Sequence, residues 1–461
     1  MLQLLLGGSG SGKTTLLYQR IRARAEKGKK SILLVPEQFT SSTEGRIYRE
    51  LGDALSGMVE SFSFTSLAEK ILSTEGGAAV QTLSDAGRAV LVRRALEELQ
   101  DNVHYYHRHR RSAAFCQMAA QTIDELKSAG LSGQQLAQLA GACGAESGKL
   151  SELALIFQGY ETLLARSGMD PSDRLELAGA RLEEALARHS LPEFLRDRAV
   201  FIDEFDTFNA PKKRLLGAML AALPSVTVAL CDDGAPLLPG DLSLFSGAKQ
   251  VAAQLRQLAR KNGAEVAVPQ LLRKDLRHRN APGLAAVAEL LETGSCTADA
   301  PAGEVRLFAA PSREEEARAA AGAIRRLMRQ GVRCGKIAVV CRDIAKYRAA
   351  VRYEFRMAEI PLYCDEPTTP EFSAPATAVR ALLEIARGAD LTENLTTLAK
   401  TGLCALSEEQ VCALENYAYT WAPTAAAWRE KFERSPKGFG EQELTEEDLR
   451  NRERAEHARA L

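Results

Sequence analysis

The sequence has almost no net charge and no long hydrophobic run. Its 59 lysines and arginines stand against 60 aspartates and glutamates, a formal net charge of −1. Any nucleic-acid contact must therefore come from local patches rather than from overall charge. No stretch approaches the roughly 18–20 uninterrupted apolar residues of a membrane span, and the residues after Met1 lack the basic start of a signal peptide. We expect a cytoplasmic protein with no membrane partner.

The cysteines also lack the spacing of metal or redox motifs. Nine of them are scattered along the chain, and no two are separated by the two residues of a C-x-x-C pair. This excludes a zinc ribbon and a thioredoxin-type motif, and it argues against a cluster-binding site within the chain. An odd number of scattered thiols is typical of a reducing cytosol.

What the sequence does contain is a repeated alternation of strands and helices. The length of 461 residues predicts about three domains. An apolar run at 2–6, a glycine-rich loop, a helix at 14–27 and an apolar run at 31–35 form a βαβ unit, which predicts a parallel sheet. Strand patterns return at 199–202 and 226–231. Between them, strand signals are scarce and amphipathic helices are expected at 83–99, 113–129, 150–166 and 173–187.

A second α/β region is expected after a linker at 292–304, which is rich in small and turn-forming residues. Strands are predicted at 305–308 and 337–341, on either side of a helix at 313–329. The charged helical pattern at 445–461 has no closing glycine, from which we expect a longer parent protein.

Residues 7–14 read GGSGSGKT and match the pattern G-x-x-x-x-G-K-[ST] at every position. Glycines let backbone N–H groups turn inward around phosphate oxygens, and the following helix points its positive end at the same anion. The lysine of this motif reaches the β- and γ-phosphates, and its hydroxyl residue ligates Mg²⁺. We therefore predict that ATP and Mg²⁺ bind at Gly7, Gly8, Ser9, Gly10, Ser11, Gly12, Lys13 and Thr14.

Two acidic pairs follow apolar strands. Asp203 and Glu204 end the run at 199–202, where we expect Asp203 to hold Mg²⁺ and Glu204 to polarise the attacking water. The alternative is an ordinary capping acid after a strand. For Asp232 and Asp233, which end the run at 226–231, sensing of the γ-phosphate and simple turn capping both stay open.

Polar and aromatic residues near the same sheet edge are candidates for nucleic-acid contact. Gln38 and Thr40 follow the second strand, and ligands of parallel sheets gather at the carboxyl ends of strands. Phe62 and Phe64 could stack on bases, but their spacing of two favours one face of a strand.

The segment 104–111, HYYHRHRR, allows three interpretations. Its histidines could bind a metal, although no acidic or cysteine partner is near in sequence. Its arginines and aromatics could contact a phosphate backbone. A solvated, flexible loop between helices is the interpretation that the sequence favours.

An ordered set of segments resembles one protein family. These segments read LLLGGSGSGKTTLL, LLVPEQFT, VESFSFTSLAEKIL, VFIDEFDTF, KIAVVCRD, EIPLYCDEPTT and KTGLCALSEEQVCALENYAYTW. Together they are similar to AddB, one of the two subunits of the bacterial AddAB ATP-dependent helicase–nuclease. The glycine-rich loop alone is generic, whereas the ordered set is specific.

The resemblance implies a superfamily 1 helicase-like chain with RecA-like P-loop domains. Residues 1–85 plus 195–290 would form the first domain, 86–194 a helical insertion, and 303–461 a truncated second region. It further implies an AddA-like subunit as the partner in a heterodimer, and DNA, both single-stranded and as duplex ends, as substrate. The iron–sulfur cluster of the family's nuclease is expected only in a C-terminal part that this chain lacks.

The resemblance also bears on individual residues. The family's surface that reads the Chi sequence matches Gln38, Thr40, Phe64, Phe205 and Phe208. Family members often carry glycine after the aspartate that holds the metal, whereas this chain carries a glutamate, which favours hydrolysis. The later helicase motifs, including an arginine finger, are expected beyond the last residue.

The function expected from all this is an ATP-binding, DNA-binding subunit of a helicase–exodeoxyribonuclease that resects double-strand breaks for recombinational repair. Two alternatives are a UvrD-like superfamily 1 helicase or translocase and, from another class, a P-loop kinase of small molecules. The long helical insertion and the second α/β region argue against the kinase.

Overall fold

The computed structural model describes residues 1–461 except 78–80, 145–146, 296–303, 365–372 and 441–442. Most of the expected linker therefore lies outside the described residues. The chain divides into two compact units, Met1–Arg306 and Leu307–Leu461. Along the described ranges, no helix is both long and apolar enough to cross a membrane.

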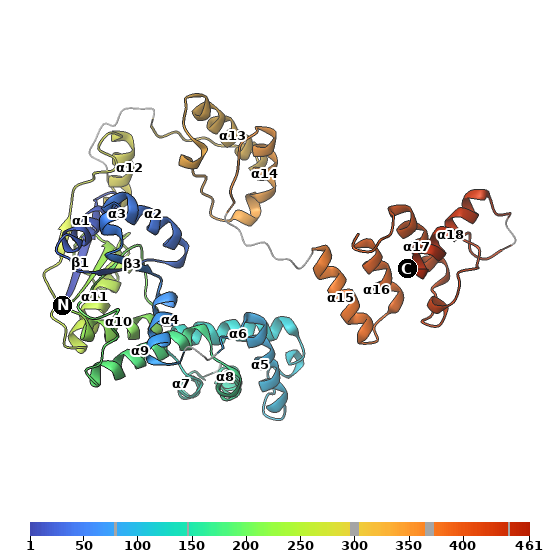
Figure 1. The fold of residues 1–461 in the computed structure, drawn as a ribbon, viewed down its shortest axis with the longest axis horizontal. Coiled ribbons are helices and arrows are strands. Elements are labelled where there is room, and N and C mark those ends of the chain that lie inside the picture. Colours follow the sequence, from blue (N-terminus) through green and yellow to red (C-terminus); the bar gives the residue numbers. More distant parts are fainter. Residues whose placement is uncertain (78–80, 145–146, 296–303, 365–372, 441–442) are drawn as a thin grey trace. The chain divides into compact units, whose positions relative to one another are not determined.

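The first unit is built around a parallel sheet (Figure 1). Its described residues form six strands in the order β3-β2-β4-β5-β1-β6, and every pairing is parallel. Strands β1, β2 and β4 are buried nearly throughout, which explains why they read as continuous apolar runs. The strands are β1 Leu2–Gly7, β2 Ser31–Leu34, β3 Val59–Phe62, β4 Ala199–Ile202, β5 Ser225–Cys231 and β6 Gln270–Leu272.

Helices cover both faces of this sheet. Successive strand residues point to opposite sides, and both sides carry apolar residues that pack against helices. On β1, Leu4 packs into the core shared with α4, α10 and α11, whereas Leu5 packs into the core shared with α1 and α2. The helices around the sheet are α1 Lys13–Ala25, α2 Thr40–Leu51, α3 Asp53–Ser56, α4 Phe64–Glu75, α10 Ala210–Ala222, α11 Ser246–Lys261 and α12 Pro282–Thr293, with a 3-10 turn at Glu37–Phe39.

One local expectation is wrong. Phe62 and Phe64 do not share the face of one strand, because Phe62 ends β3 and Phe64 begins α4. Ser63 between them caps α4 and accepts a hydrogen bond from the backbone N–H of Ser66. A serine in this position stops a strand and starts a helix.

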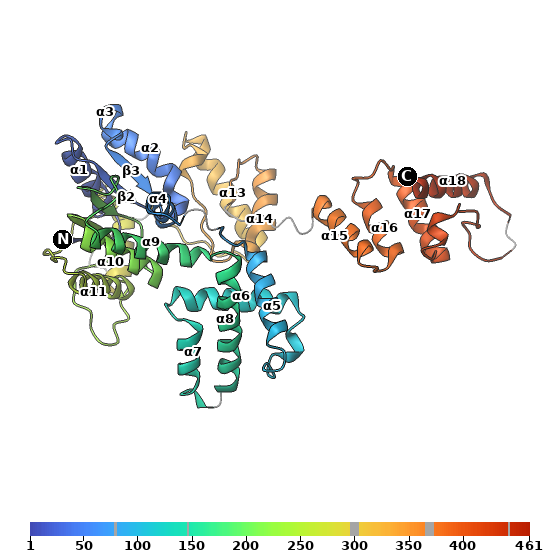
Figure 2. The same ribbon diagram turned by 60° about the horizontal axis from the view of Figure 1, so that its bottom comes forward.

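The helices expected between 83 and 187 are confirmed, and one more is present. These helices are α5 Asp85–Glu98, α6 Ala113–Ser128, α7 Gly133–Ala140, α8 Ser147–Ser167 and α9 Pro171–Ala187. The short α7 escaped the periodicity because it spans little more than two turns. We call α5, α6, α7, α8 and α9 the helical layer. Helix α9 packs against α4 and α10, so it connects this helical layer to the helices that cover the sheet (Figure 2).

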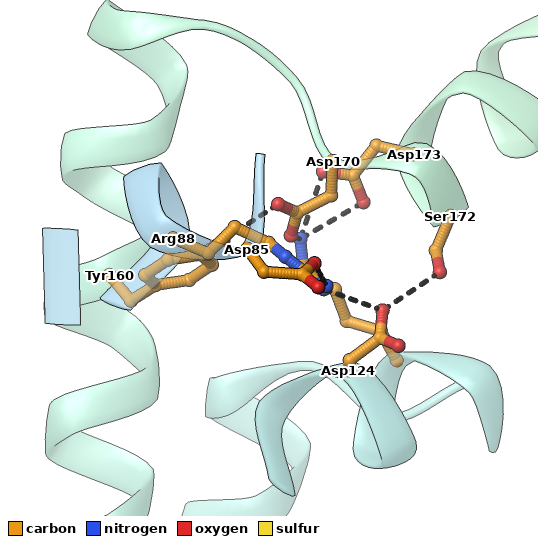
Figure 3. Close-up of polar contacts among 8 residues, drawn as sticks. Asp85, Arg88, Asp124, Tyr160, Asp170, Ser172 and Asp173 are labelled. Atoms are coloured by element: carbon orange, nitrogen blue, oxygen red, sulfur yellow. Dashed lines mark hydrogen bonds and ion pairs between the residues drawn. The ribbon is translucent and has the colours of Figure 1, made fainter. Parts of the chain in front are cut away.

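A buried ionic cluster holds these helices together (Figure 3). The Lys127 ammonium on α6 lies 2.8 Å from a carboxylate oxygen of Asp170 and 2.8 Å from one of Asp173. The Tyr160 hydroxyl donates to Asp170 at 2.6 Å. Burial by itself lowers the pKa of Lys127, but the hydrogen bonds to the two carboxylates outweigh it and raise that pKa. Burial and the bond to Asp170 also raise the pKa of Tyr160.

Arg88 extends the cluster to α5. Its guanidinium lies 2.6 Å from Asp85 and 3.2 Å from Asp124 on α6, and Ser172 at the start of α9 donates to Asp124 at 3.2 Å. Four helices are thus tied together around the buried Lys127–Asp170 pair, while the carboxylates of Asp85, Asp124 and Asp173 are partly or fully exposed.

The second unit contains two groups of helices. Helices α13 Arg313–Arg329 and α14 Ile344–Met357 pack together, and a 3-10 turn at Cys334–Lys336 lies between them in sequence. The second group comprises α15 Ala374–Ala386, α16 Leu391–Lys400, α17 Glu408–Trp421 and α18 Glu446–Ala460, with a 3-10 turn at Ala427–Arg429.

The strands predicted at 305–308 and 337–341 are not formed, and this corrects the expected second βαβ unit. Both segments are irregular in the described residues. Most of their apolar side chains are exposed, Leu307 and Val340 almost completely, and Ile337 is partly buried. A strand pattern needs neighbouring strands to satisfy its backbone, and a two-stranded pair alone is marginal at best.

The buried cluster should control the stability of the helical layer. Replacing Lys127 by methionine leaves the charge of Asp170, which is 1% exposed, without its cation. We expect the free energy of unfolding to fall by about 3–5 kcal/mol, measured by urea denaturation. Arg93→Ala, which removes an exposed pair with Glu97, should cost less than about 1 kcal/mol. Equal losses in the two variants would contradict this role of the cluster.

Candidate functional site

The glycine-rich loop connects β1 to α1 at the carboxyl edge of the sheet. Gly7 is the last residue of β1, and Gly12 is the residue before α1. Gly10 and Gly12 adopt φ values of 80° and 87°, a left-handed conformation that side chains with a Cβ rarely adopt. The chain therefore needs glycine at these two positions to turn from the strand into the helix.

Close packing around the loop requires glycine at position 7. A Cβ there would lie 2.5 Å from the Ser11 hydroxyl oxygen and 2.7 Å from the backbone carbonyl oxygen of Leu272. A Cβ at Gly8 would lie 2.6 Å from a carboxylate oxygen of Glu292, an exposed side chain that can move aside. The Ser11 hydroxyl is buried and has no hydrogen-bond partner among the described residues. A cradle without side chains and an unpartnered buried hydroxyl together fit the binding of a phosphate group.

Lys13 lies folded over this loop. Its ammonium donates to the carbonyl oxygens of Gly7 at 2.7 Å and Gly8 at 2.8 Å. Burial lowers the pKa of Lys13, although Cys231 and Asp203 act in the opposite direction. The ammonium group of Lys13 therefore lies at the mouth of the loop, where it could bind an anion.

Asp203 follows β4 and faces the start of α1. Its carboxylate accepts the backbone N–H of Glu204 at 3.0 Å. Burial raises the pKa of Asp203, and a hydrogen bond from the Thr14 hydroxyl opposes that rise. The two residues expected to hold Mg²⁺ are thus brought together by the fold, although 189 positions separate them in sequence.

Glu204 is exposed and has a strained backbone. Its φ is 64°, which costs a residue other than glycine about 1–2 kcal/mol. Burial and the neighbouring charge of Asp203 both raise the pKa of Glu204. The backbone of Glu204, directly after the buried Asp203, is strained, and such a conformation persists only where the surrounding structure holds it.

The second acidic pair is engaged in its own turn. Asp232 accepts the backbone N–H of Gly234 at 2.7 Å, and Asp233 accepts that of Ala235 at 2.8 Å. Lys249 also pairs with Asp233 at 3.3 Å. These contacts satisfy the turn-capping interpretation, while the backbone N–H of Asp232 donates to Gly7 and so ties the turn to the loop.

Residues after β6 also reach the loop, and the sequence analysis missed them. The backbone N–H of Leu276 donates to Gly10 at 3.0 Å, and Arg277 donates to the Ser9 hydroxyl at 3.2 Å. Asp275 fixes this turn by accepting the backbone N–H of Arg277. An arginine thus stands beside the loop within this chain. The available signal was the position of 273–278 directly after a parallel strand.

The residues expected to contact DNA differ widely in exposure. Gln38 is exposed and Thr40 is half-buried at the start of α2. Phe64 and Phe208 are only 2% and 4% exposed and belong to the core. Phe205 packs against both, at ring distances of 5.2 and 5.5 Å, and it is the one of the three with part of its ring open to solvent.

Fold and site together define an α/β protein in which a glycine-rich loop, a buried acid and an arginine converge at the carboxyl edge of a parallel sheet. A family model described as ADDB, N-terminal, matches residues 4–288. The chain belongs to this family.

Curated relatives agree with this assignment. The chain is 32% identical over 446 residues to the B subunit of the ATP-dependent helicase/deoxyribonuclease from Desulforudis audaxviator, covering 93% of this chain and 37% of that protein. Proteins of the same name from Symbiobacterium thermophilum and Clostridium perfringens are 31% and 27% identical, over 93% and 98% of this chain. The chain spans only 37–40% of the length of these three relatives.

The buried acid should make the folded chain less stable than it could be. Because burial raises the pKa of Asp203 in the folded chain, ionisation costs stability above that pKa and costs nothing below the ordinary carboxyl range. We expect Asp203→Asn to raise the free energy of unfolding by about 1 kcal/mol at pH 7, and the gain to vanish at acidic pH in urea titrations. Asp206→Asn, at an exposed neighbour, should change neither value. A loss of stability in Asp203→Asn at pH 7 would refute this account.

Proposed function

We propose that this chain is the ATP-binding, DNA-binding part of a helicase–deoxyribonuclease subunit. The observation that carries the proposal is the convergence of Lys13, Thr14 and Asp203 on one glycine-rich loop. The printed names of the relatives, which are ATP-dependent helicase/deoxyribonuclease subunits, support the same function. In this proposal the complex resects DNA double-strand breaks for recombinational repair.

At the nucleotide site, the loop N–H groups and Lys13 bind the phosphates. Thr14 and Asp203 hold Mg²⁺, which supplies positive charge to the phosphate oxygens when it is bound. Glu204 orients water, and its exposure beside a buried carboxylate supports hydrolysis rather than binding alone. Arg277, already hydrogen-bonded to Ser9, adds a second cation beside the loop.

The domain plan is part of the same proposal. Residues 1–85 plus 195–290 make a RecA-like domain, 86–194 its helical insertion, and 303–461 the start of a second helicase-like region. An AddA-like subunit is the partner in a heterodimer.

DNA contact is proposed at the same sheet edge as the nucleotide. Gln38 and Thr40 follow β2, and Phe205 follows β4, so all three lie where parallel strands end. Phe64 and Phe208, as they are buried, hold the ring of Phe205 rather than stack on bases themselves. This group would scan single-stranded DNA for the Chi sequence. A cation supports the assignment, since the Lys212 ammonium lies 5.6 Å from the centre of the Phe205 ring.

Replacing Lys13 by alanine should abolish binding of a fluorescent ATP analogue without unfolding the chain, because the charge at the mouth of the loop is lost. Lys27→Ala, at an exposed position just after α1, is the matched control and should bind normally. Unchanged affinity in Lys13→Ala would refute the nucleotide site. DNA-stimulated ATP turnover separates a helicase-type subunit from a small-molecule kinase, which should ignore DNA.

Replacing Phe205 by alanine should weaken binding of single-stranded DNA. Loss of one base-stacking ring costs about 1–3 kcal/mol, which corresponds to a rise in Kd of about 5- to 150-fold. Fluorescence anisotropy with a labelled oligonucleotide measures this directly. Tyr48→Ala removes another exposed aromatic ring, from α2, and should leave Kd unchanged. If both variants bind like the wild type, Phe205 is not a stacking residue.

A further inference from the structure

The loop between α5 and α6 combines several cations with aromatic rings. We call residues 104–111 the arginine loop. Its eight residues comprise three arginines, three histidines and two tyrosines, with no acidic residue. A 3-10 turn, His107–His109, lies at its centre. In a chain of nearly zero net charge, this is a marked local excess of cationic side chains.

The backbone of the arginine loop is anchored by a carboxylate from another helix. Glu152 on α8 accepts the N–H groups of His104 at 2.8 Å, Tyr105 at 2.7 Å and Tyr106 at 3.1 Å. Three consecutive N–H groups that converge on one anion fix the course of the backbone. The sequence favoured a flexible loop, but hydrogen bonds to Glu152 fix the backbone of its first half.

Aromatic contacts hold the other side of the loop. The rings of Tyr106 and His109 lie 5.1 and 6.0 Å from the ring of Phe115 on α6, which is 9% exposed. Tyr105 packs edge-on against Tyr106 at 5.0 Å and remains 60% exposed. One tyrosine therefore anchors the loop, while its neighbour presents a ring and a hydroxyl to solvent.

The three arginines of the loop have no counter-ion among the residues that the structure describes. Within the described ranges, no carboxylate forms an ion pair with any of Arg108, Arg110 and Arg111. By contrast, Arg93 and Arg94 on the adjoining α5 each pair with a glutamate one turn later, at 3.2 Å. The carboxylate that does touch the loop, Glu152, is occupied by backbone N–H groups. Three arginines within four residues of sequence are thus left to bind anions from outside.

From these contacts we propose that the arginine loop binds the phosphate backbone of DNA, at a site distinct from the nucleotide loop and from Phe205. Arginine donors match phosphate oxygens in pairs, and an exposed tyrosine adds a hydroxyl donor and a stacking surface. A metal role is not supported, because no three potential ligands gather in the part of the chain that the structure describes. The choice of DNA as the polyanion rests on the proposed function.

The test removes the three charges and compares binding of a DNA duplex with a single-stranded tail. In the 461-residue chain, Arg108→Ala, Arg110→Ala and Arg111→Ala are combined, and Kd is measured by anisotropy over a range of NaCl concentrations. We expect Kd to rise at least about 10-fold at low salt. The slope of log K against log salt should shrink by about two to three, since each phosphate contact contributes about 0.9.

Two further variants make the result specific. Combining Arg93→Ala, Arg94→Ala and Arg188→Ala removes three arginines that are already paired, and it should leave Kd and slope near the wild-type values. Combining Arg108→Lys, Arg110→Lys and Arg111→Lys keeps the charge and should restore most of the slope. Circular dichroism shows whether each variant is folded.

The outcomes separate this inference from the proposed function. If the wild-type chain binds DNA and the alanine triple binds equally well with the same slope, the inference is overturned, and the loop is left to an acidic protein partner. If the paired-arginine triple loses as much affinity, general charge rather than the loop is responsible, and the inference is also overturned. If the wild-type chain binds no DNA at all, the proposed function itself fails.

Discussion

The parallel pairing of β4 with β2 and of β1 with β5 is the constraint on which the proposed nucleotide site depends. The hydrogen-bond ladder continues one residue beyond the strands, from the N–H of Asp203 to Leu34 at 3.1 Å and from the N–H of Asp232 to Gly7 at 3.2 Å. These bonds hold each acid at the edge where the glycine-rich loop begins. Because all the strands run the same way, every loop after a strand opens toward this edge, and the loop after β6 brings in Arg277 for the same reason.

The site gathers groups that are individually unfavourable for folding. Asp203 is buried with a raised pKa, Lys13 has a lowered one, Glu204 has a left-handed backbone and the Ser11 hydroxyl lacks a partner among the described residues. Each costs folding stability. A bound phosphate would pair with Lys13 and the Ser11 hydroxyl, and a bound cation would pair with Asp203, so three of these four costs would fall on binding. The conformation of Glu204 also explains why a glycine fits this position, since glycine adopts a φ of 64° at little cost. A glutamate that keeps this conformation does so at the expense of stability, which fits a chemical role better than a structural one.

Local patterns in the sequence predicted the strands at 2–6, 31–35, 199–202 and 226–231, the glycine-rich loop and the acid after β4. They also predicted four of the five helices that the structure describes between 83 and 190. Periodicity, glycine spacing and strand-end acids are all local signals. What they could not predict depended on distant partners. The contact of Arg277 with Ser9 joins residues 268 positions apart, and no local pattern marks it. The burial of Phe64 and Phe208 comes from their packing against Phe205 and the core. The apolar runs at 305–308 and 337–341 carry the composition of strands, but a strand exists only where a neighbour pairs with it.

The helical layer shows how a chain of nearly neutral charge can still use charge in two ways. In the cluster around Lys127, the cations pair with carboxylates of neighbouring helices, so their effect is on the geometry of α5, α6, α8 and α9. In the arginine loop, the carboxylate of Glu152 accepts hydrogen bonds from backbone N–H groups. It therefore orders the loop without pairing with the guanidinium groups. An acid that fixes the backbone while leaving the side-chain charges free creates a positive patch that bulk composition hides. The partners of each ionic group, rather than the count of charges, therefore decide where such a chain can meet a polyanion.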